Sequence, residues 1–393
     1  MRKTSVLGPA IAIALAVEAG SWLGLWILRA QPGLFPPGRA RSMAELGAYL
    51  ETRDPVLGWP SRRGSSTRDS TGSRIVPAFP DPGHECASAY GGSFVYGSDV
   101  DHAATWVNQL SRTLGCRVAN FGVDGYGTDQ ALLRFRMHPA DSAPVSMLGI
   151  ISHHMLRNTT QNAYFLWGGS YVTTLKPRFV LDEDDHLTLV ALPDLDSARL
   201  ELALQNPGAV FAFDELLPGT ARGPVIREFP FTLSAIRWTV RGIAQRLETL
   251  PWRDVIDPAS PSDGYDLTVR IVRAFVDECA DRLKTCFAVV FPEAEVLEYL
   301  EVQGTSVMQA FQRDLETRGI LVLDLVHGIS ARLGDRSYCD ILVGKHCTGH
   351  YNAAGNKLVA DLIYEFLQAH DTLRTALRPA REGENGRSEP PPR

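Results

Sequence analysis

The amino-acid sequence predicts an α/β fold built on a doubly wound, five-stranded parallel sheet. Three observations support this prediction. Short apolar segments alternate with amphipathic helical segments along most of the chain. One of them, VSMLGII at 145–151, is almost continuously apolar, as expected of a parallel strand covered on both faces. The chain has 393 residues, 45% of them hydrophobic, which is ample for one large core.

The individual elements follow from apolar runs and from apolar residues at helical spacing. The strands are predicted at 86–90, 117–123, 145–151, 286–291 and 319–325, and the helices at about 106–114, at 128–137, at about 266–284, in a segment that ends near 318, and after Asn352.

The alternation is interrupted between the third and fourth strands. Residues from about 155 to 262 are predicted to form a large insertion of mixed structure that carries aromatic residues such as Tyr164, Phe165 and Trp167. Within it, the segment 170–193 alternates apolar and polar residues, which is typical of an antiparallel hairpin. The acidic run 182–185 is its predicted turn, and we expect no metal site there or elsewhere.

The N-terminal segment, residues 1–30, is predicted to be a membrane anchor. Between Val6 and Leu28 the only charged residue is Glu18, and as a helix this run is about 34 Å long, close to the ~30 Å hydrocarbon thickness of a bilayer. Arg2 and Lys3 favour a cytoplasmic start, which places the remaining chain in the periplasm or at the cell surface. The alternative is a cleaved signal peptide and a secreted protein.

The rest of the chain divides into three parts. Residues 31–80 are rich in Pro, Gly, Arg and Ser and are predicted to be a linker and a loosely packed approach to the domain. Residues 81–377 form the predicted domain, and the polar tail 378–393 is predicted to be disordered. A net charge of −6 without basic runs argues against nucleic acid as a partner.

Cysteine usage supports an oxidising compartment. Six cysteines permit fifteen connectivities, but their short separations along the chain favour three local disulfides. The expected pairs are Cys86 with Cys116, Cys279 with Cys286, and Cys339 with Cys347.

Three motifs resemble those of the SGNH, or GDSL-type, serine hydrolases. They are GGSFVYG at 91–97, NFGVDGYG at 120–127 and HYNAAGNKL at 350–358. The resemblance covers about 86–155 and 266–367, in the order that the family has them. It implies the SGNH hydrolase fold, a flavodoxin-like parallel sheet, here with a large insertion, and the hydrolysis of carboxylic esters without a cofactor.

The resemblance also implies roles for individual residues. Ser93 corresponds to the nucleophile and His350 to the general base that activates its hydroxyl. The backbone N–H groups of Ser93 and Gly122 are expected to bind the oxyanion. Two residues depart from the family pattern. Gly92 stands where the family has aspartate, and His154 stands where an asparagine side chain completes the oxyanion hole, so we expect the His154 ring to donate instead.

The acid that orients the histidine is a third departure. The family places it two or three residues before the histidine, but those positions before His350 are Thr348 and Cys347. We expect Asp340 to take this role, because a disulfide at Cys347 would bring it close. The alternatives are Asp335, a backbone carbonyl in place of the acid, or weak activity.

The predicted function is that of an extracytoplasmic serine esterase acting on an O-acyl ester. Arg157 and Asn158, which follow the third strand, are expected to line the substrate pocket. An acylated carbohydrate of the cell envelope suits the predicted location, and another small ester is equally compatible with the residues. The alternatives are an O-acyltransferase with the same site, and a catalytically impaired protein that binds glycans or assists envelope assembly.

Overall fold

The computed structural model describes most of the chain. The predicted tail 378–393 lies outside the described residues, as do parts of the predicted linker. The described residues are 7–27, 39–59, 66–220, 222–223, 225, 227–247 and 253–377.

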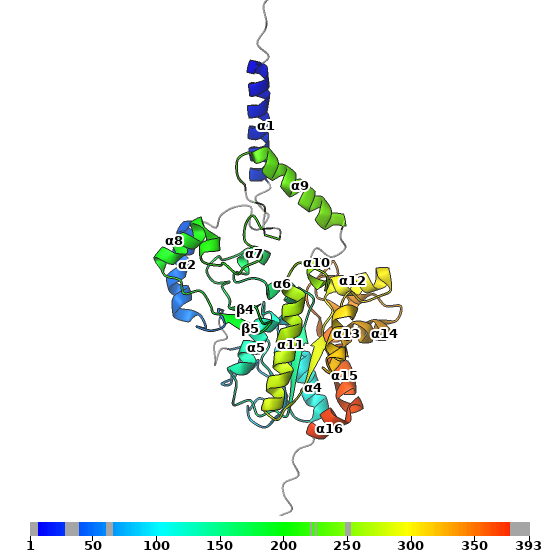
Figure 1. The fold of residues 1–393 in the computed structure, drawn as a ribbon. Coiled ribbons are helices and arrows are strands. Elements are labelled where there is room, and N and C mark those ends of the chain that lie inside the picture. The colour runs from blue at the N-terminus through cyan, green and yellow to red at the C-terminus, as the bar shows by residue number, and fades with distance from the viewer. Residues whose placement is uncertain are drawn as a thin grey trace, which may run out of the picture.

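A five-stranded parallel sheet forms the centre of the domain (Figure 1). Its strands are β1 (Glu85–Tyr90), β2 (Arg117–Asn120), β3 (Val145–Ile150), β6 (Thr285–Val290) and β7 (Val322–Asp324). They are arranged in the order β2-β1-β3-β6-β7. Counted along the chain this is 2-1-3-4-5, the flavodoxin-like order. The predicted fold class is therefore confirmed.

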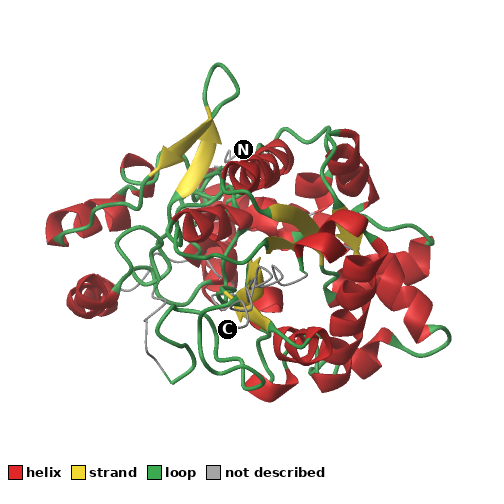
Figure 2. Cartoon of the chain, turned by 90° about the horizontal axis from the view of Figure 1, so that it is seen from below, coloured by secondary structure: helices red, strands yellow, loops and turns green. Residues whose placement is uncertain are grey.

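Helices cover both faces of this sheet, and Figure 2 shows them on either side of its strands. One core cluster joins the sheet to α5 (Thr128–Arg136), α11 (Gly264–Asp281) and α13 (Gln309–Thr317). The other joins it to α4 (Trp106–Leu114), α14 (Leu325–Leu333), α15 (Ala353–Ala369) and α16 (Asp371–Ala376). The central strand β3 is buried along its whole length, which explains its continuous apolar sequence.

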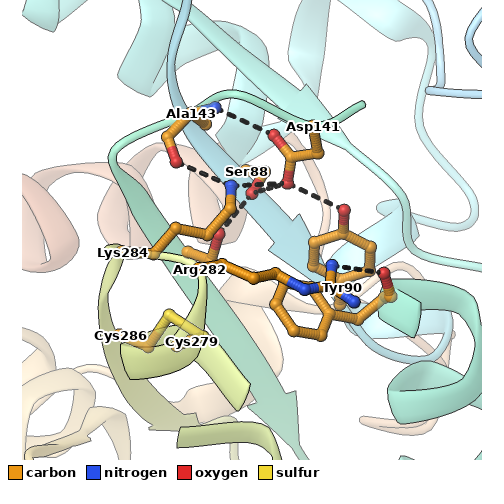
Figure 3. The surroundings of a disulfide bond; sticks show 10 residues. Ser88, Tyr90, Asp141, Ala143, Cys279, Arg282, Lys284 and Cys286 are labelled. Carbon is orange, nitrogen blue, oxygen red and sulfur yellow. Dashed lines mark hydrogen bonds and ion pairs between the residues drawn. A yellow bond between two sulfur atoms is a disulfide. The ribbon is translucent and has the colours of Figure 1, made fainter. Parts of the chain in front are cut away.

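Three disulfides join the pairs that the sequence predicts: Cys86–Cys116, Cys279–Cys286 and Cys339–Cys347. The second ties the last turn of α11 to the first residues of β6 (Figure 3). Beside it, Asp141 accepts hydrogen bonds from Ser88 and Tyr90 of β1 and forms an ion pair with Lys284. Asp141 precedes β3 and Lys284 precedes β6, so these contacts hold the segments that lead into both strands against β1.

The insertion between β3 and α11 contains the predicted hairpin. Its strands are β4 (Arg178–Leu181) and β5 (Leu187–Val190), which pair antiparallel across the predicted acidic turn. The helices of the insertion are α6 (His153–Arg157), α7 (Tyr164–Trp167), α8 (Ser197–Gln205), α9 (Phe231–Leu247) and α10 (Arg253–Ile256).

The segment before the domain differs from its prediction as a loosely packed linker. It contains α2 (Arg39–Thr52), whose Leu46 and Tyr49 pack against Tyr171 and Phe211 of the insertion. Farther along, Arg74 is buried among backbone carbonyls of the domain. The glycines and serines of this segment suggested a linker, but its scattered apolar and arginine side chains find partners that only the folded insertion and domain supply.

The N-terminal helix α1 (Leu7–Ile27) projects away from the domain (Figure 1). By length and composition it is apolar enough to cross a membrane, with a mean hydropathy of 1.7 over Gly8–Ile27. A signal sequence has the same properties, so this finding fits both expected locations.

Candidate active site

Ser93 opens a single-turn helix at the carboxyl end of β1. This helix, α3 (Ser93–Tyr96), ends at Gly97 in the left-handed conformation (φ 79°), and its Ser93 carbonyl accepts from the amides of Gly97 and Ser98. Ser93 is buried. Its hydroxyl has no hydrogen-bond partner within the part of the chain that the structure describes. The turn therefore presents an uncommitted hydroxyl where ligands of parallel sheets bind.

The residue before the serine must be glycine because two neighbours fill the space of a side chain. A Cβ atom on Gly92 would lie 2.8 Å from Nε2 of His154 and 2.9 Å from the carbonyl oxygen of Tyr126. His154 is thus adjacent to the Ser93 turn, as the sequence predicts. The two departures from the family motif, Gly92 and His154, meet in space, and the histidine ring occupies the place that glycine leaves open.

The imidazole of His154 is buried and unpaired. It is 1% exposed, and among the described residues neither ring nitrogen has a hydrogen-bond partner. Burial, with a further contribution from the nearby charge of Arg157, lowers its pKa well below the ordinary 6.5. The ring is therefore neutral at pH 7 and carries one N–H that can be donated to a ligand beside Gly92.

Glu293 holds the turn that carries this histidine. Its carboxylate accepts from the amide and hydroxyl of Ser152 and from the amide of His153, at 3.0 to 3.3 Å. Glu293 is buried, and burial raises its pKa. It follows β6, whereas the turn follows β3, so one side chain joins the ends of two neighbouring strands. Sequence analysis did not identify Glu293.

His350 is placed by the closed loop that precedes α15. The Cys339–Cys347 disulfide closes this loop. The amide of Val343, inside this loop, donates to the carbonyl of His350, which follows the loop, at 3.0 Å. The ring of His350 lies against Phe94, the residue after Ser93, with 5.0 Å between ring centroids. The structure therefore brings the predicted base to the helix turn of the predicted nucleophile.

The carboxylate beside His350 is Asp99, which corrects the prediction of Asp340. Nδ1 of His350 is 2.8 Å from Oδ2 of Asp99, in hydrogen-bond and ion-pair contact. The carbonyl oxygen of Asp340 accepts from Nδ2 of Asn352. Within the described part of the chain, neither the Asp340 carboxylate nor that of Asp335 forms a hydrogen bond or ion pair with His350. The disulfide shapes the histidine loop as expected, but the acid comes from the serine loop.

The position of Asp99 in the sequence indicates that it lies near the site. It lies six positions after Ser93, so it had to be near the same edge of the sheet. It also has φ 69°, an uncommon conformation for a residue other than glycine that aspartate tolerates better than most. The nearby Asp101 is committed elsewhere, because it accepts from the amide of Ala104.

Gly122 has a different role from the predicted one. Its amide donates to Oδ1 of Asn120 at 3.0 Å, so it is engaged within the chain. A Cβ atom on Gly122 would lie 2.3 Å from the amide nitrogen of Tyr96. This glycine therefore lets the loop after β2 pack directly on the serine helix. The amide of Gly125, later in that loop, has no partner within the described ranges.

Arg157 and Asn158 are placed differently from each other. Arg157 lies beside the site: its Nη1 donates to the carbonyl of Tyr126 and would be 3.5 Å from a Cβ atom on Gly92. Asn158 is fully buried, and its Nδ2 donates to the hydroxyls of Thr128 and Thr268. It joins α5 to α11 and does not line a pocket, contrary to the prediction.

Two tryptophans flank the loop after β2. A Cβ atom on Gly125 would contact the rings of Trp59 (3.4 Å) and Trp167 (3.8 Å). Nε1 of Trp59 donates to the carbonyl of Asp124, and the guanidinium of Arg157 lies 5.5 Å from the ring centroid of Trp167. Trp167 is 43% exposed. The site thus has an aromatic wall, formed by the approach segment and the insertion.

His154, which is buried, and the partly buried His153 predict sensitivity to acid. Burial lowers the pKa of His154 well below 6.5 and that of His153 to about 4. Below about pH 6.5 the unfolded chain therefore binds more protons than the folded chain, and the free energy of unfolding falls as the pH falls. The slope is up to about 1.4 kcal/mol per pH unit for each group. Denaturant unfolding measures this free energy between about pH 7.5 and 5.5. It should fall less steeply with decreasing pH in His154→Gln than in the parent. Equal slopes would contradict this expectation.

Comparisons with known proteins give matches among solved structures only. A member of the lipolytic G-D-S-L family from Veillonella parvula is 9% identical, with 72% of this chain and 98% of that chain covered and a TM-score of 0.36. A protein from Desulfitobacterium hafniense described as a G-D-S-L lipolytic protein is 12% identical, with 71% of this chain and 97% of that chain covered and a TM-score of 0.32. An α/β-hydrolase enzyme from the metagenome of Lake Arreo in Spain is 11% identical, with 76% of this chain and 99% of that chain covered and a TM-score of 0.38.

No protein-family model matches this chain, and no curated protein matches it in sequence. The assignment of the fold rests on the strand order of this chain.

Proposed function

We propose that this chain is a membrane-anchored serine esterase that cleaves an O-acyl ester outside the cytoplasm. One observation carries the proposal: His350 contacts both Asp99 and the ring of Phe94, so a histidine held by a carboxylate lies against the turn that begins with Ser93. Nucleophile, base and orienting acid are the components of a serine triad. The apolar helix α1 and the three disulfides support an anchored, extracytoplasmic protein.

The mechanism follows from these components. The Ser93 oxygen attacks the ester carbonyl carbon, and His350 takes the hydroxyl proton at Nε2 while Asp99 accepts the hydrogen bond from Nδ1–H. The resulting oxyanion is held by the amide of Ser93 and the neutral ring of His154. His350 then protonates the departing alcohol. Water, deprotonated by His350, attacks the carbonyl carbon of the acyl-enzyme. When the bond to the Ser93 oxygen breaks, the protonated His350 returns the proton to that oxygen, which releases the acid and restores the free hydroxyl and the neutral base.

Asp99 also bears on the catalytically impaired alternative. Two features of the sequence favour a catalytically impaired protein that binds glycans or assists envelope assembly: no carboxylate stands just before His350, and His154 replaces the usual oxyanion residue. Because Asp99 supplies a carboxylate at 2.8 Å from the base, the first feature no longer supports this alternative. The altered oxyanion residue is compensated in the same way, since His154 retains a donor beside Gly92.

Transfer of the acyl group to a sugar is the second candidate, and the aromatic wall is compatible with it. Trp59 and Trp167 offer flat apolar faces beside the site, and such faces suit either the sugar of an acylated carbohydrate or a sugar that accepts the acyl group. Adding free sugars to an ester-hydrolysis reaction separates the two. An esterified sugar formed faster than free acid would support the transferase.

The test of the proposed function is trapping of the nucleophile. A fluorophosphonate probe forms a stable bond with an activated serine, and we expect mass spectrometry to find it on Ser93. Labelling should parallel the loss of p-nitrophenyl acetate hydrolysis. Hydrolysis that continues while Ser93 is fully labelled, or labelling of another serine that abolishes it, would overturn the proposed mechanism.

The role of His154 gives a separate prediction. His154→Ala removes one oxyanion donor and is expected to lower kcat by about 10²–10³-fold, whereas His154→Gln, which keeps an amide N–H, should recover part of this loss. Gly92→Ala should resemble His154→Ala, because its Cβ displaces the ring. Gly47→Ala on α2, where a Cβ meets no atom within 4 Å, is the matched control. Full activity in His154→Ala would refute the role.

A further inference from the structure

The lone charge of α1 is bound to the start of another helix. Glu18 accepts from the amide of Phe231 at 2.5 Å and from the amide of Thr232 at 3.3 Å, the first two residues of α9. In addition, the hydroxyls of Ser21 and Thr232 are 3.3 Å apart. Helix amides at an N-terminus have no partner within their own helix and favour negative charge. Glu18 therefore caps α9: its carboxylate is the partner of the first amides of α9, and these amides are the partners of the carboxylate.

The position of this contact along α1 determines how deep the start of α9 lies relative to the membrane surface. Glu18 lies nine residues before the end of α1, which corresponds to about 14 Å along the helix. Trp22 and Trp26 follow at one-turn intervals and are both 41% exposed, and Arg227 lies over the ring of Trp22. Tryptophans gather where the headgroups meet the hydrocarbon. The start of α9 is thus one turn deeper than this interfacial level.

The exposed surface of α9 is apolar at the same end. No ionisable residue occurs from Phe229 to Ile236, and Phe229 is 73% exposed. The first charged residue of α9, Arg237, pairs with Glu228 at 3.5 Å. A row of side chains at helical spacing is about half exposed along α9: Leu233, Ile236, Val240 and Ile243. Such a row is typical of a helix that lies with one face in lipid.

We propose that α9 inserts its first turns into the outer part of the bilayer beside α1, with lipid acyl chains covering Leu233, Ile236, Val240 and Ile243. The inference rests on the proposed anchoring by α1. Acyl chains are the occupant that these contacts favour, because α9 is joined at its start to a helix whose own exposed surface is apolar. Figure 1 shows α9 running obliquely from α1 toward the domain.

The test uses nitroxide labels on the full chain in vesicles of phosphatidylcholine and phosphatidylglycerol. The cysteines of the described chain are all paired, so a single introduced thiol is labelled selectively. The variants are Leu15→Cys on α1, Leu233→Cys on α9 and Leu283→Cys, an apolar control on the domain that is 94% exposed. Collision with oxygen reports lipid, and collision with a water-soluble nickel complex reports water.

We expect the labels at positions 15 and 233 to collide with oxygen and the label at 283 to collide with nickel. Nickel access at 233 but not at 15 would overturn the α9 inference and leave the anchor standing. Nickel access at both would show that the anchor itself fails. Protection of 233 from both reagents would indicate a protein partner and also overturn it. The cap is tested by substitution: Glu18→Leu should raise nickel access at 233 at least threefold, whereas Glu18→Gln, which keeps an acceptor oxygen, should not.

Discussion

Ser93→Ala is expected to reduce kcat for ester hydrolysis by about 10⁶-fold, the scale of loss when a serine triad is disabled. The hydroxyl at Ser93 is the proposed nucleophile, and alanine removes it while adding no bulk to a buried turn. Residual turnover should be independent of His350, since the base then has no proton to take. Steady-state hydrolysis of p-nitrophenyl acetate by parent, single and double variants measures both quantities.

Ser98→Ala is the matched control for this prediction. Ser98 is a buried serine of the same loop, and its hydroxyl has no partner among the described residues. It should therefore keep the kcat of the parent. If Ser98→Ala abolished hydrolysis and Ser93→Ala did not, the nucleophile would have been assigned to the wrong residue of this loop.

Asp99→Asn is expected to lower kcat by about 10³-fold with little change in KM. Asparagine preserves size but presents an amide to Nδ1 of His350, which favours the tautomer that is unable to accept the serine proton. The same change in a triad with a buried acid costs about 10⁴-fold. The effect here is smaller because the Asp99 side chain is half exposed and water screens its charge.

Asp340→Asn separates the structural assignment from the one suggested by the sequence. Its carbonyl, which accepts from Asn352, is unchanged by this substitution, so folding and kcat should match those of the parent. Thermal unfolding of both variants checks that neither loses the fold. A large loss in Asp340→Asn with normal turnover in Asp99→Asn would reverse the assignment.

The fold could be predicted because its signals are local. β3 is apolar along its length since both of its faces are covered, and the acidic run 182–185 makes a hairpin turn whatever surrounds it. Cysteines close in the chain also pair within it. The approach segment was misread because Leu46 and Tyr49 of α2 pack against the insertion, more than 100 positions later in the chain.

The site was predictable where a motif fixes a backbone turn and not where side chains from distant segments meet. Ser93 and His350 carry their own turns, so their motifs were enough to predict that they lie at the same edge of the sheet. The partner of His350 is a contact between segments 251 positions apart, which no spacing rule encodes. The family resemblance suggested that the amide of Gly122 binds the oxyanion, and the position of Asn158 after the third strand suggested a pocket residue. In the structure both groups make their hydrogen bonds within the chain.

The location of Asp99 changes which parts of this protein are free to evolve. In the family pattern, acid and base share one segment and the nucleophile stands apart. In this chain the proposed nucleophile and acid share one short segment, and the proposed base comes from a different segment, which follows the disulfide-closed loop. The interval from Ser93 to Asp99 therefore tolerates neither insertion nor deletion. The loop before His350 has only to position the imidazole of that residue. Its length and sequence can therefore vary in related chains without loss of the proposed proton transfer.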